Sequence, residues 1–182
     1  MIILWGKPGT GKTSLPNGIA DAIGGKCITI PVQPNWTDNQ DLLGFYNVVE
    51  KRYVPTLFLD TLVEARENPE QLYLVVLDEM NLAHIELYFS DLLSKLEERR
   101  GENKDVFFEV DLGAGNEKYK VCLTENVKWV GTMNEDETTK SLSDKVIDRG
   151  NVISFPRPEK FERYAGWIPS WYKFRYGSLG VL

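Results

Sequence analysis

The chain has 182 residues, of which 42% are hydrophobic and 26% charged, a balance typical of a soluble globular domain that excludes a disordered chain. Its 27 acidic and 21 basic residues give a net charge of −6, which excludes a free-standing electrostatic binder of nucleic acid. No apolar run approaches the ~20 residues of a membrane span, and the two cysteines show no Cys-x-x-Cys spacing. We therefore expect a cytoplasmic protein with reduced thiols and no membrane contact.

Apolar runs alternate with polar helical stretches along the chain, which predicts an α/β fold. The expected strands are short and apolar on both faces, as in a parallel sheet. They cover Ile2–Trp5, Cys27–Ile30, Leu72–Leu77, Val127–Gly131 and Asn151–Phe155. The expected helices cover Thr13–Ile23, Thr56–Arg66, Ile85–Arg100 and Thr138–Ile147. The third helix is the clearest, because its apolar residues recur at a spacing of three to four.

Two segments interrupt this alternation. Two short strand-like runs, Val106–Val110 and Lys118–Leu123, flank the sequence Gly-Ala-Gly-Asn and predict a β-hairpin. The stretch Pro31–Val54 contains Pro31, Pro34, Gly44 and several aromatic residues, and we expect a long connection that carries one short helix. The predicted domains are a core over residues 1–156 and an aromatic-rich tail over residues 157–182.

Residues 6–13 match the phosphate-loop pattern G-x-x-x-x-G-K-[ST] and lie between a predicted strand and a predicted helix. Glycines let consecutive main-chain N–H groups point at phosphate oxygens, and the N-terminus of the following helix favours the same anion. Lys12 is expected to reach the β- and γ-phosphates, and the Thr13 hydroxyl is expected to ligate Mg²⁺. The expected nucleotide contacts are Gly6, Pro8, Gly9, Thr10, Gly11, Lys12, Thr13 and Ser14.

A second motif is a buried strand, Leu74–Leu77, that ends in the acids Asp78 and Glu79. Asp78 would hold Mg²⁺, because a carboxylate is a hard oxygen ligand for a hard cation. Glu79 would polarise the attacking water as the general base. Paired acids also commonly begin a loop, but next to a phosphate loop we favour the functional interpretation.

Two further residues are candidates for hydrolysis. Asn134 follows the strand Val127–Gly131, where an uncharged amide could orient the attacking water; an Asn here could also be an ordinary turn former. Arg149 follows a predicted helix and could act as an arginine finger on a neighbouring subunit's γ-phosphate. The alternative for Arg149 is a solvated helix end, where a basic residue suits the helix dipole.

The order and spacing of these elements resemble the AAA+ division of P-loop NTPases over about residues 1–156. More narrowly, the chain resembles the McrB-like branch, named for the motor subunit of modification-dependent restriction systems. The residues that carry this likeness are Asp78–Ala83, Gly131–Asn134 and Asp136–Arg149, with Trp36–Asn39 and Asp41–Gly44. The resemblance implies a three-layer αβα core with a parallel sheet, a β-hairpin insertion and a ring that binds nucleotide between subunits. Arg149 would then act in trans, and the hairpin Val106–Leu123 would face the pore or a partner.

The sequence departs from the McrB pattern at two points. Leu82 stands where the branch has Arg, and Asp136 and Glu137 stand where an Asp-Arg pair is expected. McrB proteins use GTP, so these departures leave ATP and GTP open as substrates, with ATP slightly favoured. The tail after Phe155 is too short for the helical lid of AAA+ proteins, so we expect a truncated or absent lid; Arg163 and Arg175 are its candidate arginines.

The leading functional hypothesis is Mg²⁺-dependent hydrolysis of ATP or GTP by an AAA+ motor core that forms a homo-oligomeric ring. The sequence shows no nuclease signature, so action on DNA would be indirect, through a nuclease or DNA-recognition partner chain or domain. We expect a motor core without its targeting domain. Two alternatives are a MoxR-like or dynein-related chaperone that remodels a protein client, and a nucleotide-gated assembly module that barely turns over.

Overall fold

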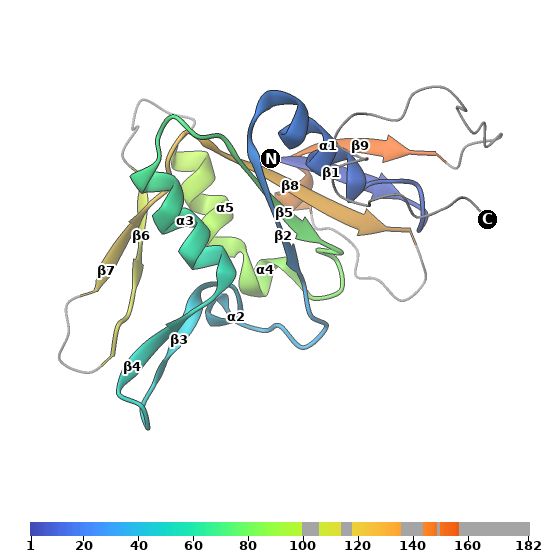
Figure 1. Ribbon diagram of the computed structural model, residues 1–182. Coiled ribbons are helices and arrows are strands. Elements are labelled where there is room, and N and C mark those ends of the chain that lie inside the picture. Colours follow the sequence, from blue (N-terminus) through green and yellow to red (C-terminus); the bar gives the residue numbers. More distant parts are fainter. Residues whose placement is uncertain (100–105, 114–117, 136–143, 149, 157–182) are drawn as a thin grey trace, which may run out of the picture.

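The structure, a computed structural model, describes residues 1–99, 106–113, 118–135, 144–148 and 150–156. Its central sheet is parallel, with strand order β2-β5-β8-β1-β9 (Figure 1). The strands are β1 (Ile2–Gly6), β2 (Lys26–Pro31), β5 (Tyr73–Asp78), β8 (Val127–Asn134) and β9 (Asn151–Phe155). All five predicted strands are confirmed. Strand β8 runs further than expected because it pairs with β1 up to the Asn134–Gly6 position.

The helices of the core are α1 (Ser14–Ile23), α3 (Leu57–Glu67), α4 (Ile85–Tyr88), α5 (Ser90–Glu98) and α6 (Asp144–Ile147). The single helix predicted over Ile85–Arg100 is wrong, because the backbone of Phe89 (φ −123°, ψ −1°) separates α4 from α5. The Phe89 ring is fully buried and packs against Trp129, which accounts for its place in the apolar pattern. Arg100 and residues 138–143, the start of the last predicted helix, lie outside the described residues.

Two antiparallel hairpins project from the core (Figure 1). The predicted one is present as β6 (Phe107–Val110) and β7 (Tyr119–Cys122). The connection between β2 and α3 contains the expected short helix, α2 (Asn39–Leu43), but also a second hairpin, β3 (Gly44–Asn47) and β4 (Arg52–Pro55), which the sequence analysis did not predict.

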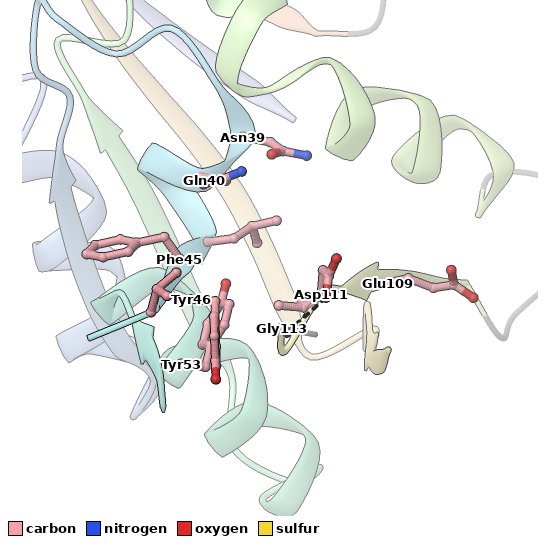
Figure 2. A pocket seen from close by; sticks show the side chains of 12 residues that line it. Asn39, Gln40, Phe45, Tyr46, Tyr53, Glu109, Asp111 and Gly113 are labelled. Carbon is pink, nitrogen blue, oxygen red and sulfur yellow. Dashed lines mark hydrogen bonds between the residues drawn. The ribbon is translucent and has the colours of Figure 1, made fainter. Parts of the chain in front are cut away.

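A hollow of about 390 Å³ lies between the two hairpins. Figure 2 shows aromatic side chains of β3 and β4 on one side of it, and Glu109 and Asp111 of the other hairpin across from them. Gly113 lies flat against the Tyr46 ring, since a Cβ at this position would be 2.6 Å from three ring carbons. The two hairpins therefore contact each other within the described residues.

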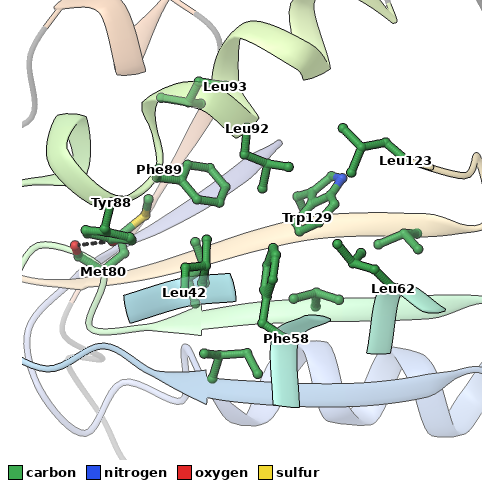
Figure 3. Close-up of a cluster of buried hydrophobic side chains, with 14 of the residues drawn as sticks. Leu42, Phe58, Leu62, Met80, Tyr88, Phe89, Leu92, Leu93, Leu123 and Trp129 are labelled. Carbon is green, nitrogen blue, oxygen red and sulfur yellow. Dashed lines mark hydrogen bonds between the residues drawn. The ribbon is translucent and has the colours of Figure 1, made fainter. Parts of the chain in front are cut away.

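The main hydrophobic core lies on the sheet face that α3, α4 and α5 cover (Figure 3). There the Phe58 and Trp129 rings pack with centroids 5.5 Å apart. Residues on the opposite face, Leu4, Val76 and Val130, form a smaller cluster, and α1 lies on this side. Helices on both faces of a parallel sheet make the three-layer αβα core that the sequence predicted.

None of the helices among the described residues has the length and apolarity required to cross a membrane. The tail over residues 157–182, with Arg163 and Arg175, lies outside the described residues, so the proposed domain division stays a prediction.

Candidate active site

The phosphate loop connects β1 to α1 and carries all eight predicted nucleotide contacts, from Gly6 to Ser14. Gly9 (φ +77°) and Gly11 (φ +87°) adopt left-handed backbone conformations that side chains with a Cβ rarely take. Gly6 is required for a different reason, because a Cβ there would lie 2.3 Å from the main-chain oxygen of Phe155 in β9. Gly9 and Gly11 thus allow the loop to curve, and Gly6 allows it to lie close to β9.

The side chain of Lys12 is buried within this loop, with only 5% of its surface exposed. Its Nζ donates hydrogen bonds to the main-chain oxygens of Gly6, at 2.8 Å, and Lys7, at 2.7 Å. Burial lowers the pKa of Lys12, and the negative charges of Asp78 and Glu79 oppose this effect. The ammonium group is therefore held within the loop by two main-chain oxygens, in the electrostatic field of both acids.

Thr13 and Asp78, the two predicted Mg²⁺ ligands, contact each other directly. Thr13 occupies the N-cap position of α1 but makes no side-chain cap; its Oγ1 instead donates to Asp78 Oδ1 at 2.8 Å. A hydroxyl and a carboxylate are both hard oxygen donors of the kind Mg²⁺ prefers. The residues present therefore fit the ion that the sequence implies.

Glu79 and Asn134 are brought together because β5 and β8 are neighbours in the sheet. The side-chain amide of Asn134 donates a hydrogen bond to Glu79 Oε1. Glu79 has a positive φ of +53°, which is uncommon for a residue with a Cβ. Arg149 lies outside the described residues.

Two further residues, to which the sequence motifs assign no role, also belong to this site. Thr132 is buried and its hydroxyl contacts both Asp78 and the main chain of Glu79. Asn81 is buried too, and its side-chain amide donates to the main-chain oxygen of Asn134 at 3.2 Å. Strand alternation could have indicated Thr132, because residues two apart in β8 share a face and Thr132 lies two residues before Asn134.

Aromatic side chains pack against the turn that follows β5 and contains Met80. Tyr88 of α4 donates its hydroxyl to the main-chain oxygen of Met80 at 2.8 Å. Trp36 packs edge-on against the Tyr88 ring, with centroids 5.2 Å apart. Gly131 leaves room for Met80, because a Cβ there would be 2.1 Å from the Met80 sulfur. These contacts hold the acidic end of β5 against β8.

A parallel sheet with a phosphate loop after its first strand and paired acids at the end of a neighbouring strand defines a P-loop nucleoside triphosphatase fold. The chain belongs to the dynein-related subfamily of AAA domains, whose family model matches residues 1–149. It is also similar to the type IV methyl-directed restriction enzyme EcoKMcrB subunit of Escherichia coli (strain K12). The two are 28% identical over 157 residues, which cover 81% of this chain and 33% of the relative.

The chain therefore spans about a third of the length of the curated relative that it matches. The predicted AAA+ family, its McrB-like branch and the predicted fold class are confirmed by these comparisons and by the parallel sheet.

Proposed function

We propose that this chain is the nucleotide-hydrolysing core of an AAA+ motor and that it hydrolyses ATP or GTP in the presence of Mg²⁺. One observation carries this proposal: Asp78 contacts Thr13 of the phosphate loop, while the next residue, Glu79, contacts Asn134. Groups suited to binding a triphosphate and groups suited to activating water therefore meet at the same edge of the sheet.

Each side chain has a distinct part in the proposed reaction. Lys12 and the loop N–H groups bind the triphosphate, with the N-terminus of α1 adding its dipole. Thr13 and Asp78 would hold Mg²⁺, which supplies neutralisation of the charge that develops on the phosphate oxygens. Glu79 accepts the proton of the attacking water, and Asn134 orients that water through its amide.

Activity would require a ring in which Arg149 of one subunit completes the site of the next. The AAA family match supports this part of the proposal. A mixing experiment tests it: Arg149→Ala and Glu79→Gln subunits should each be inactive alone. Random mixing of equal amounts restores intact sites at roughly a quarter of the interfaces, so roughly a quarter of the activity should return. A mixture that stays inactive, although it assembles, would contradict action in trans.

The substrate of the motor is proposed to be nucleic acid, reached through a nuclease or DNA-recognition partner. The relative from E. coli is named as a subunit of a methyl-directed restriction enzyme, which supports this assignment. The projecting hairpins, with Val48 and Val49 exposed at the tip of the β3–β4 turn, offer a surface for such a partner. Apolar side chains exposed at a loop tip are typical of contact sites.

The decisive assay measures phosphate release from ATP and GTP with and without duplex DNA and with and without a nuclease partner chain. Stimulation by DNA or the nuclease is expected under the motor hypothesis. Indifference to both, together with stimulation by a protein client, would favour the MoxR-like chaperone. Nucleotide-dependent assembly without phosphate release would favour the assembly module.

A further inference from the structure

Thr132 links the two acids of the site through a single hydroxyl group. Its Oγ1 donates to Asp78 Oδ1 at 2.6 Å and accepts the main-chain N–H of Glu79 at 2.9 Å. The residue is only 1% exposed, so water does not compete for either hydrogen bond. A hydroxyl can donate one hydrogen bond and accept another at the same time, as these two contacts require.

At Asp78, the Thr132 hydroxyl is one of two donors to the same oxygen. Oδ1 accepts from Thr132 and also from Thr13, at 2.8 Å. The two hydroxyls approach from β8 and from the start of α1, so together they hold the carboxylate between the sheet and the phosphate loop. Among the described residues, loss of the Thr132 hydroxyl would leave the Thr13 hydroxyl as the remaining side-chain donor to Asp78.

At Glu79, Thr132 supports a backbone conformation that is unusual for this residue type. Glu79 has φ +53°, and non-glycine residues stay in this region only where their surroundings impose it. Two of the surrounding contacts come from Thr132: its side chain accepts the N–H of Glu79, and its main-chain oxygen accepts the N–H of Met80 at 2.9 Å. This turn directs the Glu79 side chain to Asn134.

We propose that Thr132 is a positioning residue that fixes the orientation of both acids. It holds Asp78 through its carboxylate and Glu79 through its main-chain N–H. Its kinetic consequence rests on the proposed function: Thr132 governs the rate of hydrolysis and the Mg²⁺ requirement, while the affinity for the nucleotide depends on the loop. Its structural consequence, the fixed turn at Glu79, is independent of any activity.

The kinetic test compares Thr132→Val, which keeps the shape and removes the hydroxyl, with Thr132→Ser, which keeps the hydroxyl. We expect kcat of the Val variant to fall on the order of a hundredfold, with KM for the nucleotide changed by less than about threefold. The Val variant should also need more Mg²⁺ for half-maximal rate, and Ser should restore most of the rate. Thr61→Val is the matched control, since Thr61 is similarly buried (3% exposed) and its hydroxyl donates within α3, to the main-chain oxygen of Leu57.

The structural test uses hydrogen exchange in the protein without nucleotide. The Glu79 amide should exchange about tenfold faster in Thr132→Val, because its acceptor is the lost hydroxyl, and should stay protected in Thr132→Ser. The Met80 amide is an internal control, because its acceptor is the main-chain oxygen of residue 132, which every variant keeps.

The outcomes separate this inference from the proposed function. If the wild-type protein hydrolyses neither nucleotide, the proposed function is wrong. Faster exchange in Thr132→Val that is confined to the Glu79 amide would still support the positioning role. Unchanged exchange at Glu79 in Thr132→Val overturns the inference, as does equal acceleration at Glu79 and Met80, which would indicate simple local unfolding. In an active wild type, a Val variant with normal kcat and Mg²⁺ requirement also overturns it.

Discussion

The side-chain amide of Asn134 donates a hydrogen bond to Oε1 of Glu79, joining the end of β8 to the residue that follows β5. Asn81 in turn donates to the main-chain oxygen of Asn134, so the partner of the carboxylate is itself held in place. An amide donor orients a carboxylate without competing for a proton, because it cannot accept one at neutral pH. This arrangement orients the carboxylate and is compatible with the general-base role that we propose for Glu79.

Replacing Glu79 by Gln should remove the base while the loop that binds the triphosphate stays intact. We expect turnover to fall on the order of 10²- to 10⁴-fold, with the dissociation constant for the nucleotide changed by less than about threefold. Single-turnover phosphate release and an equilibrium titration measure the two quantities. Glu67→Gln, at the exposed end of α3, is the control. Turnover that survives in Glu79→Gln would show that another group is the base.

Replacing Lys12 by Ala should remove the buried cation of the phosphate loop. In the wild type, Lys12 would exchange its hydrogen bonds to the carbonyls of Gly6 and Lys7 for bonds to the phosphates when nucleotide binds. The charged phosphate oxygens are the stronger acceptors. Affinity should fall on the order of a hundredfold, seen as loss of the nucleotide-induced rise in Tm. Lys7→Ala is the matched control, because its exposed side chain belongs to the same loop. Equal losses in both variants would argue against a specific role for Lys12.

Gly6→Ala should weaken both the sheet and the loop. The added Cβ would meet the main-chain oxygen of Phe155 at 2.3 Å, which forces β1 and β9 apart. We expect the free energy of unfolding to fall by about 1–3 kcal/mol, measured by urea denaturation. Gly18→Ala is the control: it lies in α1 with open space around it and should be neutral or slightly stabilising. An equally stable Gly6→Ala variant would contradict the close approach of β9.

Glu64 should make stability depend on pH in the acid range. Its pKa is lowered from 4.5, first by the hydrogen bond from Lys26 and then by that from Tyr73. Because the folded-state pKa lies below the unfolded one, this stabilisation is present above pH 4.5 and is lost as the pH falls through the folded pKa.

Glu64→Gln should therefore lower Tm at pH 7 by on the order of one to a few degrees, since Lys26 and Glu64 are both well exposed. The difference from wild type should shrink at acid pH, which thermal denaturation across a pH series measures. A difference that persists unchanged in acid would mean that packing, and not charge, is responsible.

The sequence predicted the parallel sheet and the phosphate loop because both follow from local patterns. Strands buried on two faces are apolar throughout, as Tyr73–Leu77 are, and the loop has a fixed spacing of glycines before Lys12. The meeting of Asp78 with Thr13 also followed, since parallel strands and the loop end at the same edge of the sheet.

The hairpin β3–β4 was not predicted because its strands are only four residues long and lie in a stretch without alternating apolar and polar residues. Its turn depends on the Asn47 side chain, which accepts the N–H groups of Val49 and Glu50, and on Lys51 in a left-handed conformation. The exposed valines beside them follow no alternating pattern. The role of Thr132 was missed for another reason: a threonine in a strand is common. Its spacing from Asn134 places both residues on one face of β8, but the register of β8 against β5 is what brings Thr132 to Asp78.

The most direct test of the central claim is calorimetric titration of the protein with ATP and with GTP, with and without Mg²⁺, while light scattering follows the oligomeric state. We predict that at least one nucleotide binds more tightly with Mg²⁺ and that Asp78→Asn removes this gain in affinity. Nucleotide binding should also promote assembly of the protein into oligomers. Binding of neither triphosphate, or binding indifferent to both Mg²⁺ and Lys12→Ala, would contradict the central claim.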